Sequence, residues 1–270
     1  MNKNLLINNN LMVAIKASIY AGHEILKVYN EKFNYELKDD LSPLTAADKN
    51  ANDVINKYLE TTNIPIISEE NTQIDYEVRK KWKQCWIVDP LDGTKEFIKR
   101  NGEFTVNIAL IDNGKPIIGV IYIPVEEKLY YADVEKGKAY VIDINKESIS
   151  DDFLFNESVL IKKRDKIEKE KIKVVGSRSH MNDETLTFID NLRAKRFKVE
   201  VVSKGSSLKF CLVVEDKADI YPRFAPTMEW DTAAAHAICN ASGVSIIGED
   251  TKEELTYNKK NLLNPWFICK

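Results

Sequence analysis

The chain has 270 residues, of which 44% are hydrophobic and 30% are charged, with a formal net charge of -3 and an isoelectric point near 5.8. These values are ordinary for a soluble globular protein and exclude a polycationic surface, so we do not expect a binder of duplex nucleic acid. The length allows either one large domain or two closely packed halves.

Neither disulfides nor a membrane segment are expected. The four cysteines lie far apart, without the Cys-x-x-Cys or histidine spacing of a zinc site, which predicts buried free thiols in a reducing compartment. The opening residues have too short an apolar stretch for a signal peptide, and no window approaches the roughly 18 apolar residues of a membrane span. The expected location is the cytoplasm.

Two amphipathic helices open the chain. Apolar residues recur every three or four positions over residues 11–29, which predicts one face of a long helix. Thr45 and Asp48 have the spacing of a capping box at the start of a second helix. Asp48 could therefore only cap this helix, or it could also face a metal-binding loop and orient a water molecule.

Two short apolar strands that end in carboxylates follow. Residues 64–67 lead to Glu69 and Glu70, and residues 86–88 lead to Asp89. Alone, the glutamate pair indicates a solvated loop. Because another acidic segment follows some twenty residues later, a shared cation site is favoured.

The segment from Asp89 to Thr94 is a stiff turn. Pro90 fixes its own φ and favours an extended Asp89, while Gly93 permits backbone angles that a Cβ would forbid. A turn of this kind holds its side chains in a defined direction at the carboxyl end of a strand, where active sites are common.

Four oxygen donors of this turn can converge on one point. They are the carboxylates of Asp89 and Asp92, the carbonyl of Leu91 and the hydroxyl of Thr94, and hard oxygen donors are what Mg²⁺ requires. The alternative is a simple Asx turn after a strand. A phosphatase loop with an aspartate nucleophile is excluded, because its two carboxylates are two positions apart and here they are three apart.

The rest of the first half predicts a largely antiparallel sheet. Strands are expected over residues 105–111, 116–123, 129–132 and 139–142. Between residues 143 and 171 charges of both signs crowd together and periodicity weakens, which favours a solvated connector. We therefore expect an N-terminal lobe over residues 1–155 and a C-terminal lobe over residues 156–270.

The second half repeats a unit of strand, polar turn and helix. A strand over residues 172–175 leads through residues 176–180 to a helix over 183–192. A strand over residues 199–202 leads through a serine-rich turn to another helix. Such turns can present N–H groups and hydroxyls to phosphate, which predicts two anionic groups on a ligand. The alternative is two ordinary loops capped by serine.

The last predicted helix opens at Asp231 and is rich in alanine, which allows close packing on a sheet. A strand over residues 218–221, which ends at Pro222-Arg223, precedes it, and a final strand is expected over residues 266–268. Asp231 could be a plain N-cap or the last acidic ligand of the cation site.

Three separated motifs resemble those of the inositol monophosphatase superfamily, whose members are Mg²⁺-dependent, lithium-sensitive phosphomonoesterases. They are Ser68-Glu69-Glu70, Asp89-Pro90-Leu91-Asp92-Gly93-Thr94 and Trp230-Asp231-Thr232-Ala233-Ala234, and the similarity covers nearly the whole chain.

More narrowly, residues 94–105, 177–180 and 204–210 resemble the bacterial 3'(2'),5'-bisphosphate nucleotidases of this superfamily. Inositol phosphatases usually have Asn-Phe after the Gly-Thr pair, where this chain has Lys95-Glu96-Phe97.

The resemblance implies a layered α-β-α-β-α sandwich of the inositol monophosphatase and fructose-1,6-bisphosphatase type, with features of both the α+β and α/β classes. It implies Mg²⁺ as the cofactor, with about two or three ions. It places most metal ligands in the N-terminal lobe, and the nucleotide-binding turns with the last ligand in the C-terminal lobe. The implied metal ligands are Glu69, Asp89, which bridges ions, the Leu91 carbonyl, Asp92 and Asp231.

The resemblance also implies roles in catalysis and substrate binding. Asp48, Glu69 and Thr94 are the implied catalytic residues, which orient the attacking water and provide a proton route. The implied substrate-contacting residues are Glu69, Leu91, Asp92, Gly93, Thr94, His180, Ser206, Lys209, Arg223 and Asp231.

The expected reaction is hydrolysis of adenosine 3',5'-bisphosphate to AMP and phosphate by a metal-activated water, which links the protein to sulfate assimilation. The alternatives are an inositol or sugar monophosphatase and, in a different class, a catalytically silent nucleotide-binding regulatory protein. We expect a monomer whose partner is the small nucleotide, located in the cytoplasm or peripherally at the cytoplasmic face of the inner membrane.

Overall fold

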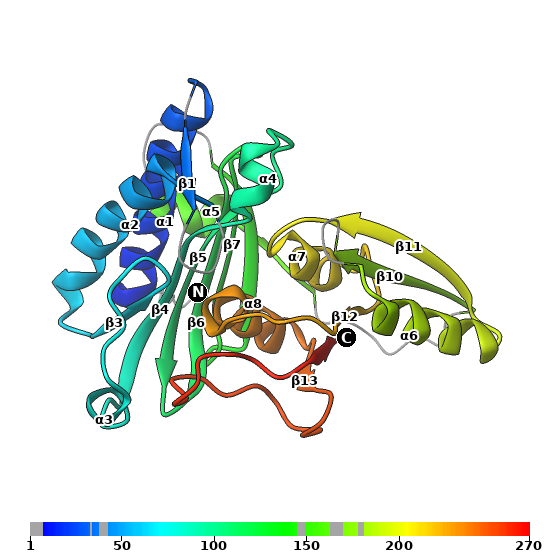
Figure 1. Cartoon of the computed structure of the whole chain (residues 1–270). Coiled ribbons are helices and arrows are strands. Elements are labelled where there is room, and N and C mark those ends of the chain that lie inside the picture. The colour runs from blue at the N-terminus through cyan, green and yellow to red at the C-terminus, as the bar shows by residue number, and fades with distance from the viewer. Residues whose placement is uncertain (1–7, 33, 38–42, 145–148, 163–169, 178–180) are drawn as a thin grey trace.

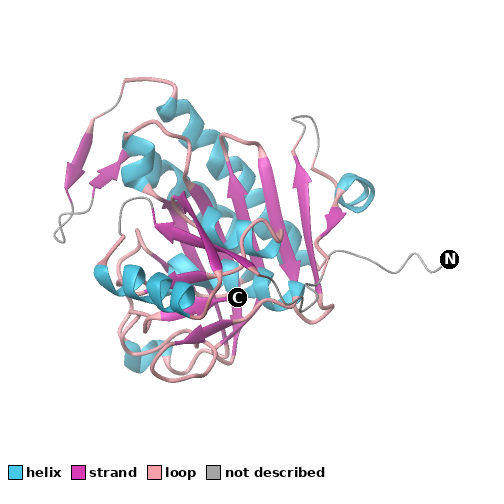
Figure 2. Ribbon diagram, turned by 90° about the vertical axis from the view of Figure 1, so that its right-hand side faces the viewer, coloured by secondary structure: helices cyan, strands magenta, loops and turns pink. Residues whose placement is uncertain are grey.

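A seven-stranded sheet forms the centre of the computed structural model, which describes residues 8–32, 34–37, 43–144, 149–162, 170–177 and 181–270. The first pair, β3 and β4, is parallel and every later pair is antiparallel. Figure 2 shows the long strands of this sheet lying side by side. In spatial order the strands are β3 (Ile66–Ser68), β4 (Gln84–Asp92), β5 (Thr105–Asp112), β6 (Lys115–Ile123), β7 (Lys128–Asp133), β8 (Lys138–Asp143) and β9 (Val159–Leu160).

Helices α1 (Asn9–Tyr29) and α2 (Ala46–Leu59) cover one face of this sheet (Figure 1). Their buried apolar stripes, including Ile15 and Ile55, pack with strand residues such as Val120 in one hydrophobic core. The predicted pair of amphipathic helices on an antiparallel sheet is therefore confirmed. A short hairpin of β1 (Tyr35–Leu37) and β2 (Pro43–Thr45) precedes α2, and the 3₁₀ helix Glu60–Thr62 follows it.

Helix α8 (Glu229–Ser242) covers the opposite face of the sheet (Figure 1). Its alanines are buried, and Gly119 of β6 lies so close that an added Cβ would be 2.3 Å from the carbonyl oxygen of Ala234. Only a glycine opposite small helix residues allows this approach. The predicted close packing of the alanine-rich helix is confirmed.

A smaller lobe extends beyond α8 (Figure 1). In it β10 (Lys171–Ser177) pairs in parallel with β11 (Lys198–Lys204), and α6 (Asp183–Ala194) and α7 (Leu208–Val214) pack against this pair. A bridge from Val174 to Ile220 continues the pair towards the sheet β12-β14-β13, formed by Tyr221–Arg223, Phe267–Cys269 and Ile246–Gly248. Together with α1 and α2, this gives the expected layered α-β-α-β-α order.

The remaining helices are short: α3 (Tyr76–Arg79), α4 (Thr94–Ile98) and α5 (Asp151–Glu157). No helix in the described ranges is long and apolar enough to cross a bilayer.

Two predicted elements differ from the structure. The strand expected over residues 218–221 is wrong in its bounds, because the backbone N–H groups of Lys217 and Ala218 bond to the Leu212 carbonyl at the end of α7. Pairing begins at Ile220 with the bridge to Val174, and β12 itself begins at Tyr221. The described part of the expected connector contains α5 and β9, and β9 pairs with β8 at the edge of the main sheet. The division at residue 155 stays a prediction.

Candidate active site

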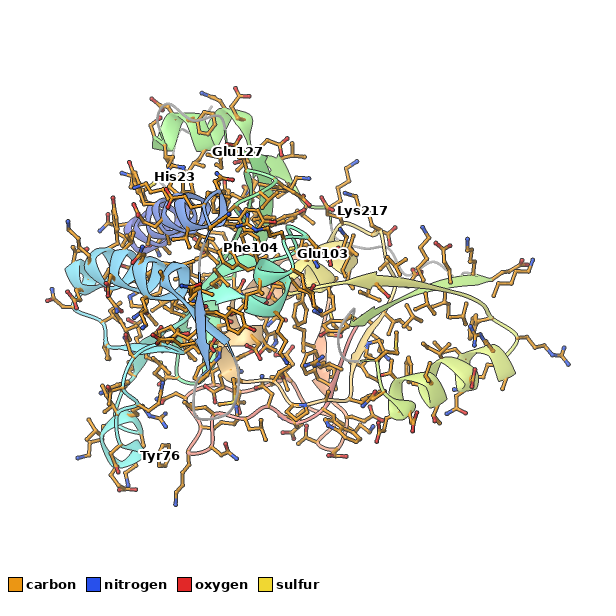
Figure 3. The ribbon with its side chains drawn as sticks, turned by 45° about the horizontal axis from the view of Figure 1, so that its top comes forward. His23, Tyr76, Glu103, Phe104, Glu127 and Lys217 are labelled. Carbon is orange, nitrogen blue, oxygen red and sulfur yellow. The ribbon has the colours of Figure 1, made fainter. Side chains whose placement is uncertain are left out.

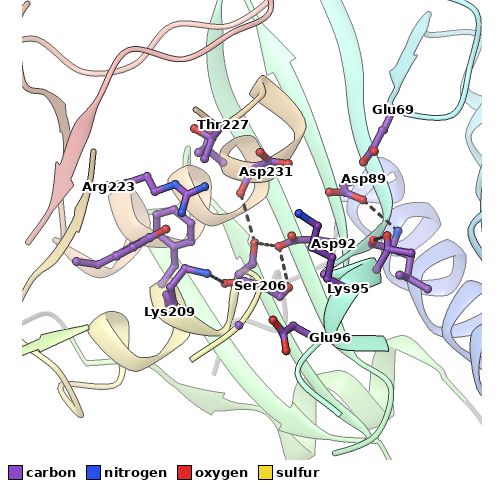
Figure 4. A pocket seen from close by; sticks show the side chains of 18 of the residues that line it. Glu69, Asp89, Asp92, Lys95, Glu96, Ser206, Lys209, Arg223, Thr227 and Asp231 are labelled. Carbon is purple, nitrogen blue, oxygen red and sulfur yellow. Dashed lines mark hydrogen bonds between the residues drawn. The ribbon is translucent and has the colours of Figure 1, made fainter. Parts of the chain in front are cut away.

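The candidate active site is a pocket of about 380 Å³ between the carboxyl end of β4 and the N-terminal ends of α4, α7 and α8. Acidic side chains gather at one end, where Lys95 also lies beside Asp92, and Lys209 and Arg223 lie at the other end, with Ser206 between them (Figure 4). The predicted site residues that line it are Glu69, Asp89, Leu91, Asp92, Gly93, Thr94, Ser206, Lys209, Arg223 and Asp231.

The acidic end is built where β4 departs from regular pairing with β5. The register between the two strands shifts between Asp89 and Asp92, which makes a bulge. Pro90 lies in the bulge and has no N–H to give to a ladder, while Gly93, with φ of +96°, turns the chain into α4. The bulge therefore lets Asp89 and Asp92 line the same pocket.

Three carboxylates, those of Asp89, Asp92 and Asp231, offer oxygen atoms that lie within 4.8 Å of one another in the described part of the chain. Burial, with the charges of Glu69, Asp92 and Asp231, raises the pKa of Asp89 well above its usual range. Burial, with the charges of Asp92 and Glu69, also raises the pKa of Asp231 to about 8. A hard divalent cation fits this donor set, because it would relieve the mutual repulsion of the acids.

Asp48 caps α2 and also contacts Thr94 in the turn that follows β4, while its role in orienting a water molecule stays a prediction. Its Oδ2 accepts hydrogen bonds from the backbone N–H of Thr45 at 2.7 Å and from the Thr45 hydroxyl at 2.6 Å, which completes the capping box of α2. Its Oδ1 accepts a hydrogen bond of 3.1 Å from the hydroxyl of Thr94. Asp48 thus lies behind the pocket, in contact with the turn that follows β4, and burial raises its pKa.

Asp231 is not the N-cap of its helix, because α8 begins at Glu229 and its N-cap is Met228, while the role of Asp231 as a cation ligand stays a prediction. It lies in the first turn of α8, where its Oδ2 accepts a hydrogen bond of 2.8 Å from the backbone N–H of Met228. The fully buried carboxylate of Glu229 accepts from the backbone N–H groups of Asn258 and Lys259 and from the Lys259 ammonium at 2.6 Å. These contacts hold the turn that carries Asp231.

Lys209 and Arg223 form the cationic end. The ammonium of Lys209 donates to the carbonyl of Ser206 at 2.5 Å and lies 5.4 Å from the ring centroid of Tyr221. Burial lowers the pKa of Lys209 to about 8. Arg223 donates from Nη2 to the Pro226 carbonyl at 3.0 Å, while its buried Nε has no hydrogen-bond partner among the described residues. This end can therefore offer donors to an anionic group.

The structure also places residues here that sequence reasoning missed. Thr105, Asn107 and Ser207 are buried beside Asp92. The sequence contains a signal for Thr105 and Asn107, because they are polar residues on one face of an otherwise apolar strand. His180 lies outside the described residues, so its predicted contact stays a prediction.

Comparison with known proteins identifies the family. The model of the inositol monophosphatase family matches residues 8–265. A 3'(2'),5'-bisphosphate nucleotidase CysQ of Salmonella typhimurium is 44% identical over 252 residues, covering 92% of this chain and 94% of the relative. The CysQ of Haemophilus influenzae is 33% identical, covering 97% and 91%.

Solved structures agree with this. The crystal structure of CysQ from Bacteroides thetaiotaomicron, a bacterial member of the inositol monophosphatase family, matches with a TM-score of 0.87 and 48% identity, covering 99% of this chain and 98% of that one. An IMPase of Thermotoga maritima at 23% identity has a TM-score of 0.74, covers 97% of this chain and 92% of that one, and shares the fold. The chain therefore belongs to the inositol monophosphatase family, a family of phosphatases.

Proposed function

We propose that the protein is a Mg²⁺-dependent 3'(2'),5'-bisphosphate nucleotidase that hydrolyses adenosine 3',5'-bisphosphate to AMP and phosphate. The observation that carries this proposal is the polarity of the pocket, with three clustered carboxylates at one end and two cationic side chains at the other. A substrate with one phosphate for each end matches this arrangement. The similarity to proteins named CysQ supports the same substrate.

The acidic end would hold about two or three Mg²⁺ ions through oxygen donors only. When bound, Mg²⁺ supplies charge stabilisation for the phosphoryl oxygens and makes a water molecule more acidic. The residues that would hold it are Glu69, Asp89, the Leu91 carbonyl, Asp92 and Asp231, all of which line the pocket.

Asp48 and Thr94 provide a route for the proton of the attacking water. The Thr94 hydroxyl donates to Asp48 Oδ1 at 3.1 Å, so its lone pairs are available to orient a water molecule from the pocket. Burial raises the pKa of Asp48, which makes this carboxylate a better proton acceptor. Glu69 lines the same end and completes the catalytic set.

Lys209 and Arg223 hold the phosphate that does not react, and their binding energy positions the phosphate that does. Ser206 connects the two ends, because its hydroxyl donates to Asp92 at 2.7 Å while its carbonyl accepts from Lys209. His180 belongs to the same proposed set of nucleotide contacts.

A substrate panel tests this proposal against its closest rival. We expect a higher kcat/KM for adenosine 3',5'-bisphosphate than for inositol 1-phosphate, which has no second phosphate for the cationic end. We expect it also to exceed that for fructose 1,6-bisphosphate, because the similarity to proteins named as bisphosphate nucleotidases favours a nucleotide. A preference for either of the other two would favour an inositol or sugar monophosphatase. Phosphate release that depends on Mg²⁺ and is inhibited by Li⁺ would exclude a catalytically silent nucleotide-binding protein.

A further inference from the structure

One oxygen of Asp92 is the common acceptor of three hydrogen bonds. Asp92 Oδ2 accepts from Ser206 Oγ at 2.7 Å, from Ser207 Oγ at 3.0 Å and from Asn107 Nδ2 at 3.4 Å. No hydrogen bond from the described residues reaches Asp92 Oδ1. The carboxylate is therefore held through one oxygen, while the other is left for a ligand.

The orientation of Asn107 is determined by its neighbours. Its amide group donates to Ser207 Oγ at 3.0 Å as well as to Asp92, and its carbonyl oxygen accepts from the Thr105 hydroxyl at 2.9 Å. The Thr105 hydroxyl also lies 2.7 Å from Ser206 Oγ. Asn107 and Ser207 are each only 1% exposed, so water does not compete for these hydrogen bonds.

The turn that contains Gly205, Ser206 and Ser207 is held by contacts with Glu103, in the segment that follows α4. Glu103 Oε2 accepts a hydrogen bond of 2.8 Å from the backbone N–H of Gly205, and Glu103 pairs with Lys204 at 3.4 Å. An added Cβ at Gly205 would lie 3.0 Å from the Glu103 carbonyl oxygen, so the two backbones approach closely. Figure 3 shows Glu103 at the junction of the main sheet and the smaller lobe.

We propose that Ser207 and Asn107 are positioning residues for Asp92, which direct its Oδ1 towards the cation, and that Glu103 holds the turn that makes this possible. The inference rests on the proposed function, because it concerns the same site. It assigns to Ser207 and Asn107 a role in divalent-cation affinity and no contact with the nucleotide.

The test is Mn²⁺ binding without substrate, measured as the loss of the free-ion signal in electron paramagnetic resonance. Ser207→Ala and Asn107→Ala are each expected to raise the Kd for Mn²⁺ by about tenfold, as for other residues that orient metal ligands. Ser242→Ala is the matched control, because Ser242 is also fully buried and donates to the carbonyls of Ile238 and Cys239 at the far end of α8. Its Kd is expected to stay within about twofold of the wild type, since it leaves the hydrogen bonds of Asp92 intact.

Wild-type Mn²⁺ affinity in both Ser207→Ala and Asn107→Ala would overturn the inference, as would an equal loss in Ser242→Ala. A second readout, cleavage of the bisphosphate nucleotide by the wild type, distinguishes failure of this inference from failure of the proposed function. If the wild type cleaves no bisphosphate nucleotide but Ser207→Ala still weakens Mn²⁺ binding, the inference holds and the proposed function fails. If the wild type cleaves the nucleotide and both variants bind Mn²⁺ normally, the inference fails alone.

Discussion

Asp92 is the residue on which most contacts of the site converge, since it belongs to the carboxylate cluster and accepts three hydrogen bonds. Asp92→Asn keeps the side-chain volume but removes a charge that the cation requires. We expect kcat to fall by about a thousandfold, because a lost cation ligand costs several kcal/mol of transition-state stabilisation. Steady-state kinetics with excess Mg²⁺ checks this, and unfolding in urea should show a stable fold.

Asp112→Asn is a suitable control. Asp112 lies at the other end of the β4–β5 pair, where it accepts a hydrogen bond of 3.1 Å from Gln84. This variant should keep wild-type turnover. Retained activity in Asp92→Asn would argue strongly against the proposed cation site.

Lys209 gives a second prediction at the scale of one residue. Its replacement should weaken binding of a nucleotide with two phosphates by about tenfold to a hundredfold, the usual effect of losing a charged hydrogen-bond partner. Hydrolysis of a generic monoester should change much less, because that substrate does not reach the cationic end. Lys209→Met keeps the apolar packing against Tyr221 and should behave like Lys209→Ala. Equal losses on both substrates would refute this role.

Sequence reasoning at this scale works where a residue has a local signature. The Asp89–Thr94 segment, Asp48 and Asp231 stand out because turns, caps and strand ends have short sequence patterns. Ser207 has no such signature, and the polar face that includes Asn107 does not identify its partner, because the two residues that form this contact are 100 positions apart. Local periodicity carries no information about such a contact.

The contact of α8 with β6 is the element-scale feature that carries Asp231 into the site. An added methyl at Gly119 would lie 2.3 Å from the Ala234 carbonyl oxygen and 2.7 Å from the Ala237 Cβ, so Gly119→Ala must push the helix away. We expect a loss of about 2 kcal/mol in the free energy of unfolding. We also expect about a hundredfold loss of kcat, because a shift of about 1 Å displaces Asp231 from the cluster. Urea titration and steady-state kinetics measure the two effects.

Gly137→Ala separates packing from backbone strain. Gly137 has a φ of +60° in the turn between β7 and β8, and no atom lies within 4 Å of an added Cβ. We expect a destabilisation of about 1 kcal/mol with unchanged turnover. If Gly119→Ala showed the same pattern, α8 would not transmit the strain to the site.

Elements with strong periodicity are correctly predicted, as α1, α2 and the antiparallel strands show. Tertiary contacts decide the others. The two-residue strand β9 is too short to have a pattern of its own and exists because β8 offers an unpaired edge. The start of β12 is displaced because the residues before it complete the end of α7.

At the scale of the whole molecule, the layers bury a neutral histidine between α8 and the C-terminal segment. His236 is fully buried, its Nδ1 lies 2.9 Å from the Tyr257 hydroxyl, and its Nε2 has no hydrogen-bond partner among the described residues. Burial lowers its pKa from 6.5 to about 4. The unfolded chain therefore binds a proton below about pH 6.5 that the folded chain does not bind until about pH 4.

The contribution of neutral His236 to the free energy of unfolding is complete above pH 6.5 and is lost as the pH falls towards 4. The whole loss amounts to about 3 kcal/mol. His236→Asn keeps a partner for Tyr257 but cannot titrate, so its free energy of unfolding should fall less than that of the wild type between pH 7 and pH 4.5. Urea titrations at several pH values give the difference in the free energy of unfolding between the variant and the wild type. The contributions of the other titratable groups are the same in both proteins and cancel in this difference. His23→Asn, on the exposed side of α1 (Figure 3), should follow the wild type. Identical pH profiles for His236→Asn and the wild type would show that the buried imidazole does not limit stability in acid.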